Sequence, residues 1–334
     1  MLIDRANRRS EDIVQPKVAT LALCSDVYME APLHVAASSV LSSLHPDWSA
    51  KFYLLDNGIG SAGLRRLRET LDRCRRPYEL IEISDADLTI FKRLRPFHGT
   101  YTTYSRFLLP DYVTEKRFLY IDTDTVTAAD VSPLFQVDMG GHALGVVVAG
   151  KVRFALESEF YMAQGAKPDD PAFNAGVMLF DVEQWQSQNC FSRTMDFCNA
   201  HPDKLTAADQ TALNVLFAKD CYHLSPEFNV QLSTVIREPI PDHGIFHFVG
   251  SPKPWDLLGE FFHPYHYIWR QAMKGIALNF AQASAYTDPR SWVRFTRILG
   301  GYRRILRQRY HHVRAERQKP QAVPEQHPSR TPEA

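Results

Sequence analysis

Short apolar runs alternate with amphipathic stretches along the first third of the chain. The apolar runs predict buried strands at residues 18–24, 51–56, 78–83 and 116–122. The stretches between them predict helices, one of them near residues 101–109, and in the stretch at 32–44 the apolar side chains recur on one helical face. Because strands that alternate with helices usually pair in parallel, we expect an α/β fold with a mostly parallel sheet flanked by helices. Ligands of such sheets bind at the carboxyl ends of the strands.

The same pattern continues through the middle of the chain. It predicts further strands at 143–149, 175–182 and 245–250, and helices at 182–199 and 207–218. We find no internal repeat and no linker in this part of the sequence. We therefore expect one domain over residues 18–287, preceded by an N-terminal extension at residues 1–17.

Residues 288–319 have a different pattern, in which apolar residues recur every three or four positions opposite many arginines. The apolar residues are Trp292, Phe295, Ile298, Leu299, Tyr302, Ile305, Leu306 and Tyr310. This spacing predicts an amphipathic helical segment, and Asp288 and Pro289 suit its N-cap and first turn. Gly300 and Gly301 interrupt the pattern, so one helix and two short helices are both compatible with it. Residues 320–334 are rich in Pro, Gln and Glu and predict a disordered tail.

Charge is unevenly distributed, although the whole chain has 38 basic and 38 acidic residues. Residues 290–319 contain ten basic side chains and a single acidic one, Glu316, so the rest of the chain is net acidic. A basic helix with aromatic residues on its apolar side is typical of a segment that binds an anionic membrane surface. The alternative is a terminal helix that packs on the domain and exposes its basic face to solvent. We expect no nucleic-acid partner, because the acidic domain would repel phosphates.

The composition is that of a globular protein, with 45% hydrophobic and 23% charged residues. No apolar run approaches the roughly 18 residues of a membrane span, and no apolar stretch typical of a secretory signal follows the N-terminal charges. The five cysteines are widely spaced and include no C-x-x-C pair, so we expect reduced thiols and no cysteine zinc site. These features predict a cytoplasmic protein that residues 288–319 hold at the inner face of the cytoplasmic membrane.

One glycine-rich turn suggests a dinucleotide-binding site. Gly58, Gly60 and Gly63 form a G-x-G-x-x-G pattern after a predicted strand and before a predicted helix. Glu82 follows about 20 residues later, as in a dinucleotide-binding turn. However, the turn follows the second strand rather than the first, and polar residues separate it from the strand end. An ordinary glycine-rich loop is therefore the alternative.

Two aspartates come directly after the strand predicted at 116–122. Asp122 and Asp124 would both lie at the ligand-binding edge of the sheet, where two carboxylates this close repel each other unless a cation lies between them. The pair therefore suggests a hard divalent metal, which can hold a diphosphate and neutralise its charge as it leaves. The alternative is a pair of loop aspartates, one of which caps a turn.

A histidine on an apolar strand is more often a core residue than a ligand, and His247 lies in such a strand. Its neighbours favour a binding role, because Gly250 allows close backbone approach and Lys253 offers a charge suited to phosphate. An imidazole that joins two carboxylates would favour manganese over magnesium.

Asn174, Asp209 and Gln210 are polar residues next to apolar runs. By themselves they are explained equally well by a strand-edge turn and by a helix N-cap.

Several segments occur in the order and spacing of a known family: TYTTYSRFLLPDYV, FLYIDTDTV, FNAGVMLFDVEQW, DQTALNVLF and HFVGSPKPW. Together they resemble the retaining glycosyltransferases of family 8, which include bacterial lipopolysaccharide galactosyl- and glucosyltransferases. The resemblance extends from Val18 to Trp255. It implies a GT-A fold, with a Rossmann-like sheet that binds a nucleotide sugar. It also implies that the extra glycines near Gly58 are incidental, since the family has a turn there.

The resemblance implies transfer of a hexose, glucose or galactose, from a UDP-sugar donor to a saccharide or glycolipid acceptor, as in the synthesis of lipopolysaccharide or other cell-surface glycans. By matched position, the metal ligands are Asp122, Asp124 and His247. The family binds Mn²⁺ there, and Mg²⁺ is the alternative.

The resemblance also assigns donor contacts. Tyr28 would stack on uracil with Asp26 beside it, Arg106 matches a donor-site arginine, and Gly250 and Lys253 match diphosphate contacts. The donor sugar would meet Asn174, Asp209 and Gln210, and Gln210 would lie nearest the reacting face.

Two positions depart from the family pattern. Ala149 stands where the galactosyltransferases have a carboxylate, and Val27 stands where they often have an asparagine. The first change removes a contact to the sugar and leaves the choice of hexose open. It also leaves a second interpretation open, in which the chain binds a UDP-sugar with little or no turnover.

Overall fold

The computed structural model describes residues 17–97, 99–234, 238–278 and 289–317. Most of the predicted N-terminal extension, the N-cap at Asp288 and the tail at 320–334 lie outside these residues.

A seven-stranded sheet forms the centre of the molecule, with the order β3-β2-β1-β4-β7-β6-β8. Its strands are β1 (Lys17–Asp26), β2 (Trp48–Asn57), β3 (Tyr78–Ile83), β4 (Arg117–Ile121), β6 (Leu144–Lys151), β7 (Pro171–Asp181) and β8 (Tyr222–His223). Strands β1 to β4 run in parallel, while β7 is antiparallel to both of its neighbours. The expected mostly parallel α/β sheet is therefore confirmed. Since β7 is reversed, it begins at the edge of the sheet where β4 and β6 end.

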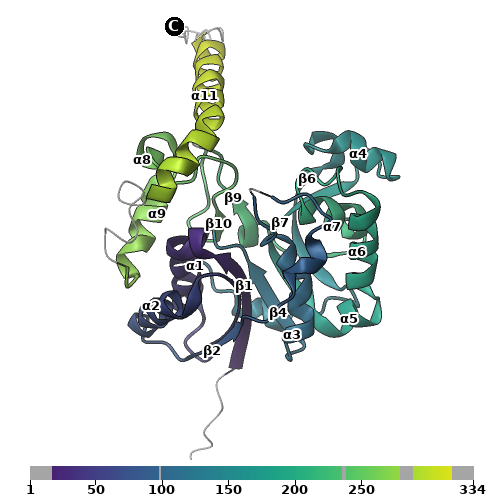
Figure 1. Cartoon of the computed structure of the whole chain (residues 1–334), viewed down its shortest axis with the longest axis vertical. Coiled ribbons are helices and arrows are strands. Elements are labelled where there is room, and N and C mark those ends of the chain that lie inside the picture. The colour runs from purple at the N-terminus through teal and green to yellow at the C-terminus, as the bar shows by residue number, and fades with distance from the viewer. Residues whose placement is uncertain (1–16, 98, 235–237, 279–288, 318–334) are drawn as a thin grey trace, which may run out of the picture.

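Helices cover both faces of this sheet (Figure 1). One face carries α1 (Glu30–Ser43) and α2 (Gly60–Arg73), and the other carries α5 (Val182–Ser187), α6 (Cys190–Ala200) and α7 (Asp209–Phe217). Strand β1 shows why both faces are covered. Its Leu21 and Leu23 pack in the cluster under α1 and α2, while Ala22 and Cys24 pack in the cluster under α6 and α7.

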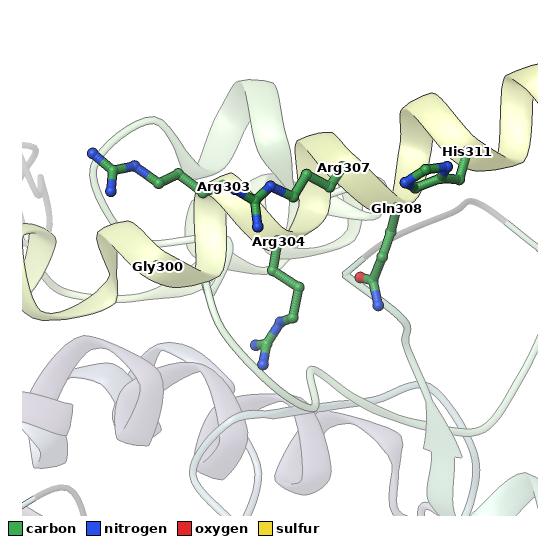
Figure 2. A pocket seen from close by; sticks show the side chains of 6 residues that line it. All are labelled: Gly300, Arg303, Arg304, Arg307, Gln308 and His311. Carbon is green, nitrogen blue, oxygen red and sulfur yellow. The ribbon is translucent and has the colours of Figure 1, made fainter.

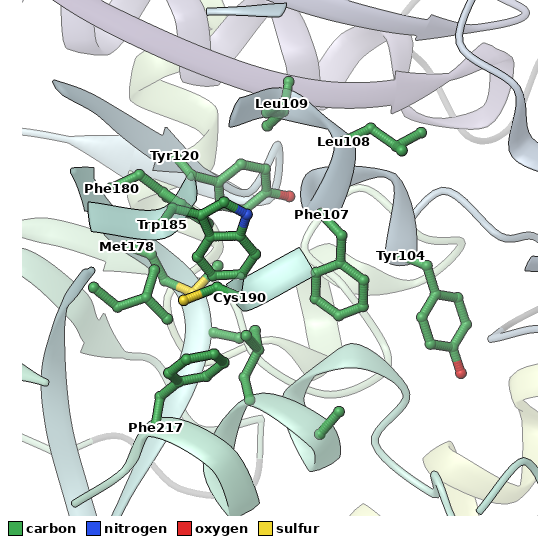
Figure 3. Close-up of a cluster of buried hydrophobic side chains, with 14 of the residues drawn as sticks. Tyr104, Phe107, Leu108, Leu109, Tyr120, Met178, Phe180, Trp185, Cys190 and Phe217 are labelled. Atoms are coloured by element: carbon green, nitrogen blue, oxygen red, sulfur yellow. The ribbon is translucent and has the colours of Figure 1, made fainter. Parts of the chain in front are cut away.

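The second of these clusters supports two segments that carry predicted site residues. Figure 3 shows Phe180 and Trp185 between the sheet and the helices, with Phe217 of α7 on one side and Phe107 on the other. Phe107 belongs to a 3₁₀ helix, Tyr104–Leu108, which continues into α3 (Leu109–Tyr112). The helix predicted near residues 101–109 is thus a 3₁₀ turn followed by a short α-helix. Buried aromatic packing holds it against the sheet.

A smaller sheet of three strands lies beside the first, in the order β5-β10-β9. Its strands are β5 (Thr125–Thr127), β10 (Ile245–His247) and β9 (Val230–Gln231). β10 pairs antiparallel with β5, and His247 is opposite Thr125. This pairing brings a late segment of the chain next to the turn that follows β4.

The remaining helices lie around the edges: α4 (Ser158–Ala163), α8 (Gly259–Phe262), α9 (His266–Ala272) and α11 (Pro289–Arg317). α4 stands beyond the end of β6, and α11 rises from the body beside α8 and α9 (Figure 1). No helix in the described ranges is long and apolar enough to cross a membrane.

The C-terminal segment is a single helix that continues through Gly300 and Gly301. Its apolar residues divide into two sets. Tyr302 and Ile305 are buried against the body, whereas Leu299, Leu306 and Tyr310 are exposed. The helix therefore packs on the domain and also presents apolar side chains outward.

Candidate active site

Three side chains predicted to bind a metal lie together at the carboxyl end of β4. Asp122 and Asp124 are in the turn between β4 and β5, and His247 ends β10. The Nε2 atom of His247 lies 3.0 Å from Oδ1 of Asp124 and 3.8 Å from Oδ2 of Asp122. One ligand atom from each residue lies within 4.8 Å of the others. Two carboxylates and an imidazole at this separation are a donor set that could hold a divalent metal ion.

Gly176 makes the close approach of His247 possible. A β-carbon at this position would overlap Cε1 of the imidazole and lie 2.7 Å from Oδ2 of Asp122. The backbone of Gly176 also accepts a hydrogen bond of 2.7 Å from the amide of Asp122. The side chains of His247 and Asp122 thus occupy the space that a side chain at Gly176 would need. The sequence pattern did not indicate this role, because the glycine lies inside an otherwise regular strand.

Hydrogen bonds fix the orientation of the imidazole. The amide nitrogen of Asn229 donates to Oδ1 of Asn174 at 3.1 Å, so its oxygen faces Nδ1 of His247, 3.0 Å away. Nδ1 then donates to this oxygen, and Nε2 is the ring atom that faces the carboxylates. Asn229 is buried, and no feature of the sequence had indicated it.

Basic side chains surround the two carboxylates. Oδ1 of Asp122 accepts hydrogen bonds from Arg106 at 3.0 Å and from the Tyr120 hydroxyl at 2.6 Å. The ammonium of Lys253 lies 2.5 Å from Oδ2 of Asp124. Burial alone would raise the pKa of Asp124, but Lys253 and His247 outweigh it and hold this pKa well below its usual range. Asp124 is therefore a carboxylate at neutral pH, as a metal ligand must be.

Arg106 is buried between two acids. Its guanidinium lies 3.0 Å from Asp122 and 3.1 Å from Oδ2 of Asp209, and it stacks over the ring of Tyr120. Burial raises the pKa of Asp209 to about 6, although Arg106 and the Thr103 hydroxyl oppose the rise. Asp209 is thus directed at Arg106 in this structure.

The amides predicted to meet the donor sugar form a connected group. Oε1 of Gln210 accepts from the side-chain amide of Asn174 at 3.0 Å and from the backbone of Ala175 at 3.2 Å. Asn174 in turn accepts from Asn229, which contacts His247. A continuous chain of hydrogen bonds therefore joins the predicted sugar-contacting residues to the metal-binding cluster.

A buried glutamate holds the turn that carries Asp209 and Gln210. Oε1 of Glu157 accepts hydrogen bonds from the backbone of Thr206 at 2.8 Å and of Ala207 at 3.2 Å, and from the Thr211 hydroxyl at 2.8 Å. The next residue, Ala208, has a φ of 55°, which non-glycine residues rarely adopt. In the sequence nothing distinguishes Glu157 from the many surface acids.

The predicted nucleotide contacts lie at or just after the ends of β1 and β10. Asp26 ends β1 and accepts hydrogen bonds from the backbone of Tyr28 at 2.9 Å and from the Thr102 hydroxyl at 3.3 Å. Tyr28 is 61% exposed, as a stacking surface requires. Gly250 follows β10 with a φ of 78°, a conformation that favours glycine.

The glycine-rich turn has a different role from a phosphate cradle. The carboxylate of Asp56 accepts hydrogen bonds from the amides of Gly58 at 2.9 Å, Ile59 at 2.6 Å and Gly60 at 3.1 Å. The amides that would meet a pyrophosphate in a dinucleotide-binding turn are therefore bonded to the chain itself. This geometry favours the ordinary-loop alternative.

Comparisons with known proteins agree with this architecture. The model of the family described as glycosyl transferase family 8 matches residues 20–259. The chain is 27% identical to General stress protein A of Bacillus subtilis over 269 residues, which covers 75% of this chain and 91% of that protein. It is 26% identical over 179 residues to a lipopolysaccharide 1,3-galactosyltransferase of Salmonella typhimurium, which covers 48% of this chain and 51% of that enzyme.

A solved structure also shares the fold. The galactosyltransferase LgtC, crystallised with donor and acceptor sugar analogues, superposes with a TM-score of 0.65 at 23% identity, covering 78% of this chain and 97% of LgtC. The expected GT-A fold is confirmed by this likeness. Since the family model also spans β1 to α8 and includes the Asp122, Asp124 and His247 cluster, the chain belongs to glycosyl transferase family 8.

Proposed function

We propose that this glycosyltransferase moves a glucose or galactose residue from a UDP-sugar to a saccharide or glycolipid acceptor, with retention at the anomeric carbon and with Mn²⁺ as cofactor. The observation that carries the proposal is the convergence of Asp122, Asp124 and His247 from distant segments. The name of the Salmonella relative supports a hexose donor and a role in lipopolysaccharide or cell-surface glycan synthesis.

Asp122, Asp124 and His247 would hold the metal. Bound there, Mn²⁺ supplies positive charge that neutralises the diphosphate as it departs. Lys253 adds a second positive charge at the same place, because its ammonium already lies against Asp124. Gly250 leaves room for the diphosphate to approach the backbone, and Asp26 and Tyr28 bind the uracil.

The donor sugar would lie against Asn174 and Gln210. The carbonyl oxygen of Gln210 already accepts two hydrogen bonds, and an amide oxygen is a weak nucleophile, so a covalent intermediate on this residue is disfavoured. We propose instead that the acceptor hydroxyl attacks on the face that the leaving diphosphate vacates. The new glycosidic bond replaces the bond from the sugar to the diphosphate, whose departing oxygen takes up the hydroxyl proton. Asp209 contributes by holding Arg106 beside Asp122, and the aligned amides stabilise the cationic sugar.

Turnover assays with UDP-glucose and UDP-galactose test this function. We expect release of UDP that requires Mn²⁺, stops with EDTA and returns when Mn²⁺ is added in excess. The Asp124→Asn variant should lose at least about 100-fold in rate, because the charge on a metal ligand is removed. Binding of the UDP-sugar without release of UDP would support the non-catalytic alternative, and metal-independent release would contradict the proposed metal site.

We also propose that α11 binds an anionic membrane surface from the inner side of the cytoplasmic membrane. A cavity of about 550 Å³ opens along this helix (Figure 2), and its lining is Gly300, Arg303, Arg304, Arg307, Gln308 and His311. The three arginines are exposed and make no ion pair with any residue in the described ranges. The exposed Leu299, on the same helix, adds apolar surface. Each basic residue near an anionic surface contributes about 1 kcal/mol.

Co-sedimentation with phosphatidylglycerol vesicles tests this attachment. The full chain should pellet with anionic vesicles and not with phosphatidylcholine vesicles. Replacement of Arg303, Arg304 and Arg307 by glutamine should abolish pelleting while UDP release in solution is retained. Equal pelleting of both proteins would contradict the proposed membrane contact.

A further inference from the structure

Helix α11 lies directly on the loop that carries Lys253. A β-carbon on Gly301 would lie 3.3 Å from the carbonyl oxygen of Ser251, so helix and loop approach closely there. Farther along the loop, the carbonyl of Leu257 accepts a hydrogen bond from the Tyr302 hydroxyl of the helix. Arg309 donates to the carbonyl of Phe262 at 2.6 Å. Residues 251–262 are therefore held along the part of the helix that extends to Arg309.

The strongest link between the two segments is an ion pair. The Nε atom of Arg294 donates to Oδ1 of Asp256 at 2.6 Å. The Asp256 side chain is only 3% exposed, and its second oxygen accepts a hydrogen bond of 2.7 Å from the backbone of Lys253. One buried carboxylate thus joins the C-terminal helix to the backbone of the lysine.

Lys253 is in turn held at the metal-binding cluster. Its ammonium lies 2.5 Å from Asp124 and donates to the carbonyl of Phe248, and its side chain is 12% exposed. The position of this ammonium depends on where the lysine backbone lies, because a buried side chain has few alternative rotamers. Asp256 holds that backbone through its hydrogen bond to the Lys253 amide, and Arg294 holds Asp256.

We infer that Arg294 is a positioning residue of the donor site, which acts through Asp256 to place the Lys253 ammonium beside the diphosphate of the bound nucleotide. The inference rests on the proposed use of a UDP-sugar. With this role of Arg294, helix α11 contributes to the donor site and also carries the basic outer surface. Without Arg294, the buried Asp256 pairs with no cation among the residues that the structure describes, so the loop must rearrange to hydrate this carboxylate and the ammonium moves with it.

Isothermal titration of UDP in the presence of Mn²⁺ tests the inference on the full-length protein. We expect Arg294→Gln to weaken UDP binding by about tenfold or more, the cost of misplacing one charge-assisted hydrogen bond. Arg294→Lys, which keeps the charge, should recover most of the affinity. Arg297→Gln is the matched control, because Arg297 is an exposed arginine on the same helix and makes no ion pair with any described residue.

A double-mutant cycle separates a positioning role from a general structural one. If Arg294 acts through Lys253, then Arg294→Gln should cause no further loss of UDP affinity in a Lys253→Ala background. Equal losses in both backgrounds, or wild-type affinity in Arg294→Gln, would overturn the inference. If Arg294→Gln does not fold, Asp256→Asn, which preserves the side-chain shape, takes its place in the same cycle. Failure of the wild-type protein to bind UDP would instead refute the proposed function, on which the inference depends.

Discussion

Gly176 and His247 are in such close contact that a β-carbon on the glycine would lie 2.7 Å from Nδ1 of the imidazole and overlap Cε1. The two residues lie on strands of different sheets, β7 and β10, and both lie beside Asp122. Since His247 is buried, it has no room to turn away from an added methyl group.

Gly176→Ala should therefore displace the imidazole and separate the three predicted metal ligands. Misplacement of a site group by about 1 Å can cost about 100-fold in rate, so we expect at least this loss of activity. We also expect weaker Mn²⁺ binding, which electron paramagnetic resonance can measure. Gly275→Ala is the control, because its β-carbon would meet open space. Unchanged Mn²⁺ affinity in Gly176→Ala would show that His247 is not a ligand.

Arg106→Ala should destabilise the fold as well as the site. The substitution leaves Asp122 and Asp209 without the buried guanidinium that now lies within 3.1 Å of both. Removal of one partner of a buried ion pair costs about 3–5 kcal/mol, which urea denaturation would detect as a lower free energy of unfolding. Arg153→Ala provides the comparison, because Arg153 pairs with Asp169 at the surface and such pairs contribute about 0–1 kcal/mol. Similar losses in the two variants would contradict the structural role of Arg106.

Glu157→Gln should slow turnover without weakening metal binding. The Glu157 carboxylate accepts from two backbone amides and the Thr211 hydroxyl, and an amide in its place presents a donor to some of these groups. The turn that carries Gln210 would then shift, and we expect kcat to fall by about tenfold. The control is Glu159→Gln, an exposed position on α4. A parallel fall in Mn²⁺ affinity would mean that the damage extends beyond this turn.

Two buried histidines should make the protein less stable in mild acid. Burial, helped by Arg66, lowers the pKa of His34 to about 4, and burial lowers the pKa of His263 to about 3. Both values lie below the ordinary 6.5, so the unfolded chain binds these protons at a higher pH than the folded chain does. The free energy of unfolding should therefore fall as the pH drops below about 6.5 toward 4, by about 3 kcal/mol for His34 alone.

The change is measured by urea denaturation between pH 7 and pH 4.5. His34→Gln should reduce the pH dependence, since glutamine can still meet the Thr70 hydroxyl, which now lies 2.6 Å from Nδ1 of His34. His45→Gln, at a side chain that is 52% exposed, is the control substitution. A pH dependence equal to that of the wild type in His34→Gln would rule out His34 as its source.

Much of the fold could be predicted from local pattern. The strands at 18–24, 51–56 and 78–83 were expected within a few residues of β1, β2 and β3, because a buried run of apolar residues depends only on its immediate neighbours. The geometry of the segment at 101–109 was harder to predict. Its packing on Phe91 and the sheet decides between α and 3₁₀ geometry, and its own periodicity does not.

The C-terminal helix shows the limit of periodicity. A regular spacing of apolar residues indicated one apolar face, yet Tyr302 is buried and Leu306 is exposed. Which side chains of a helix meet the body depends on how the helix docks, and the docking here is fixed by Tyr302 on Leu257 and Arg294 on Asp256. Neither partner can be identified from the helix sequence.

Local sequence was sufficient to place Asp122 and Asp124 at the end of a buried strand, because the alternation of apolar residues and the following turn are encoded within a few positions. That His247 meets them was an expectation from family resemblance, and the antiparallel pairing of β5 with β10 brings the three together. Gly176, Asn229, Glu157 and Arg294 acquired their roles only in the folded chain. Contacts between residues this far apart depend on strand register and helix docking, which are set by the packing of the whole core rather than by any neighbouring residue.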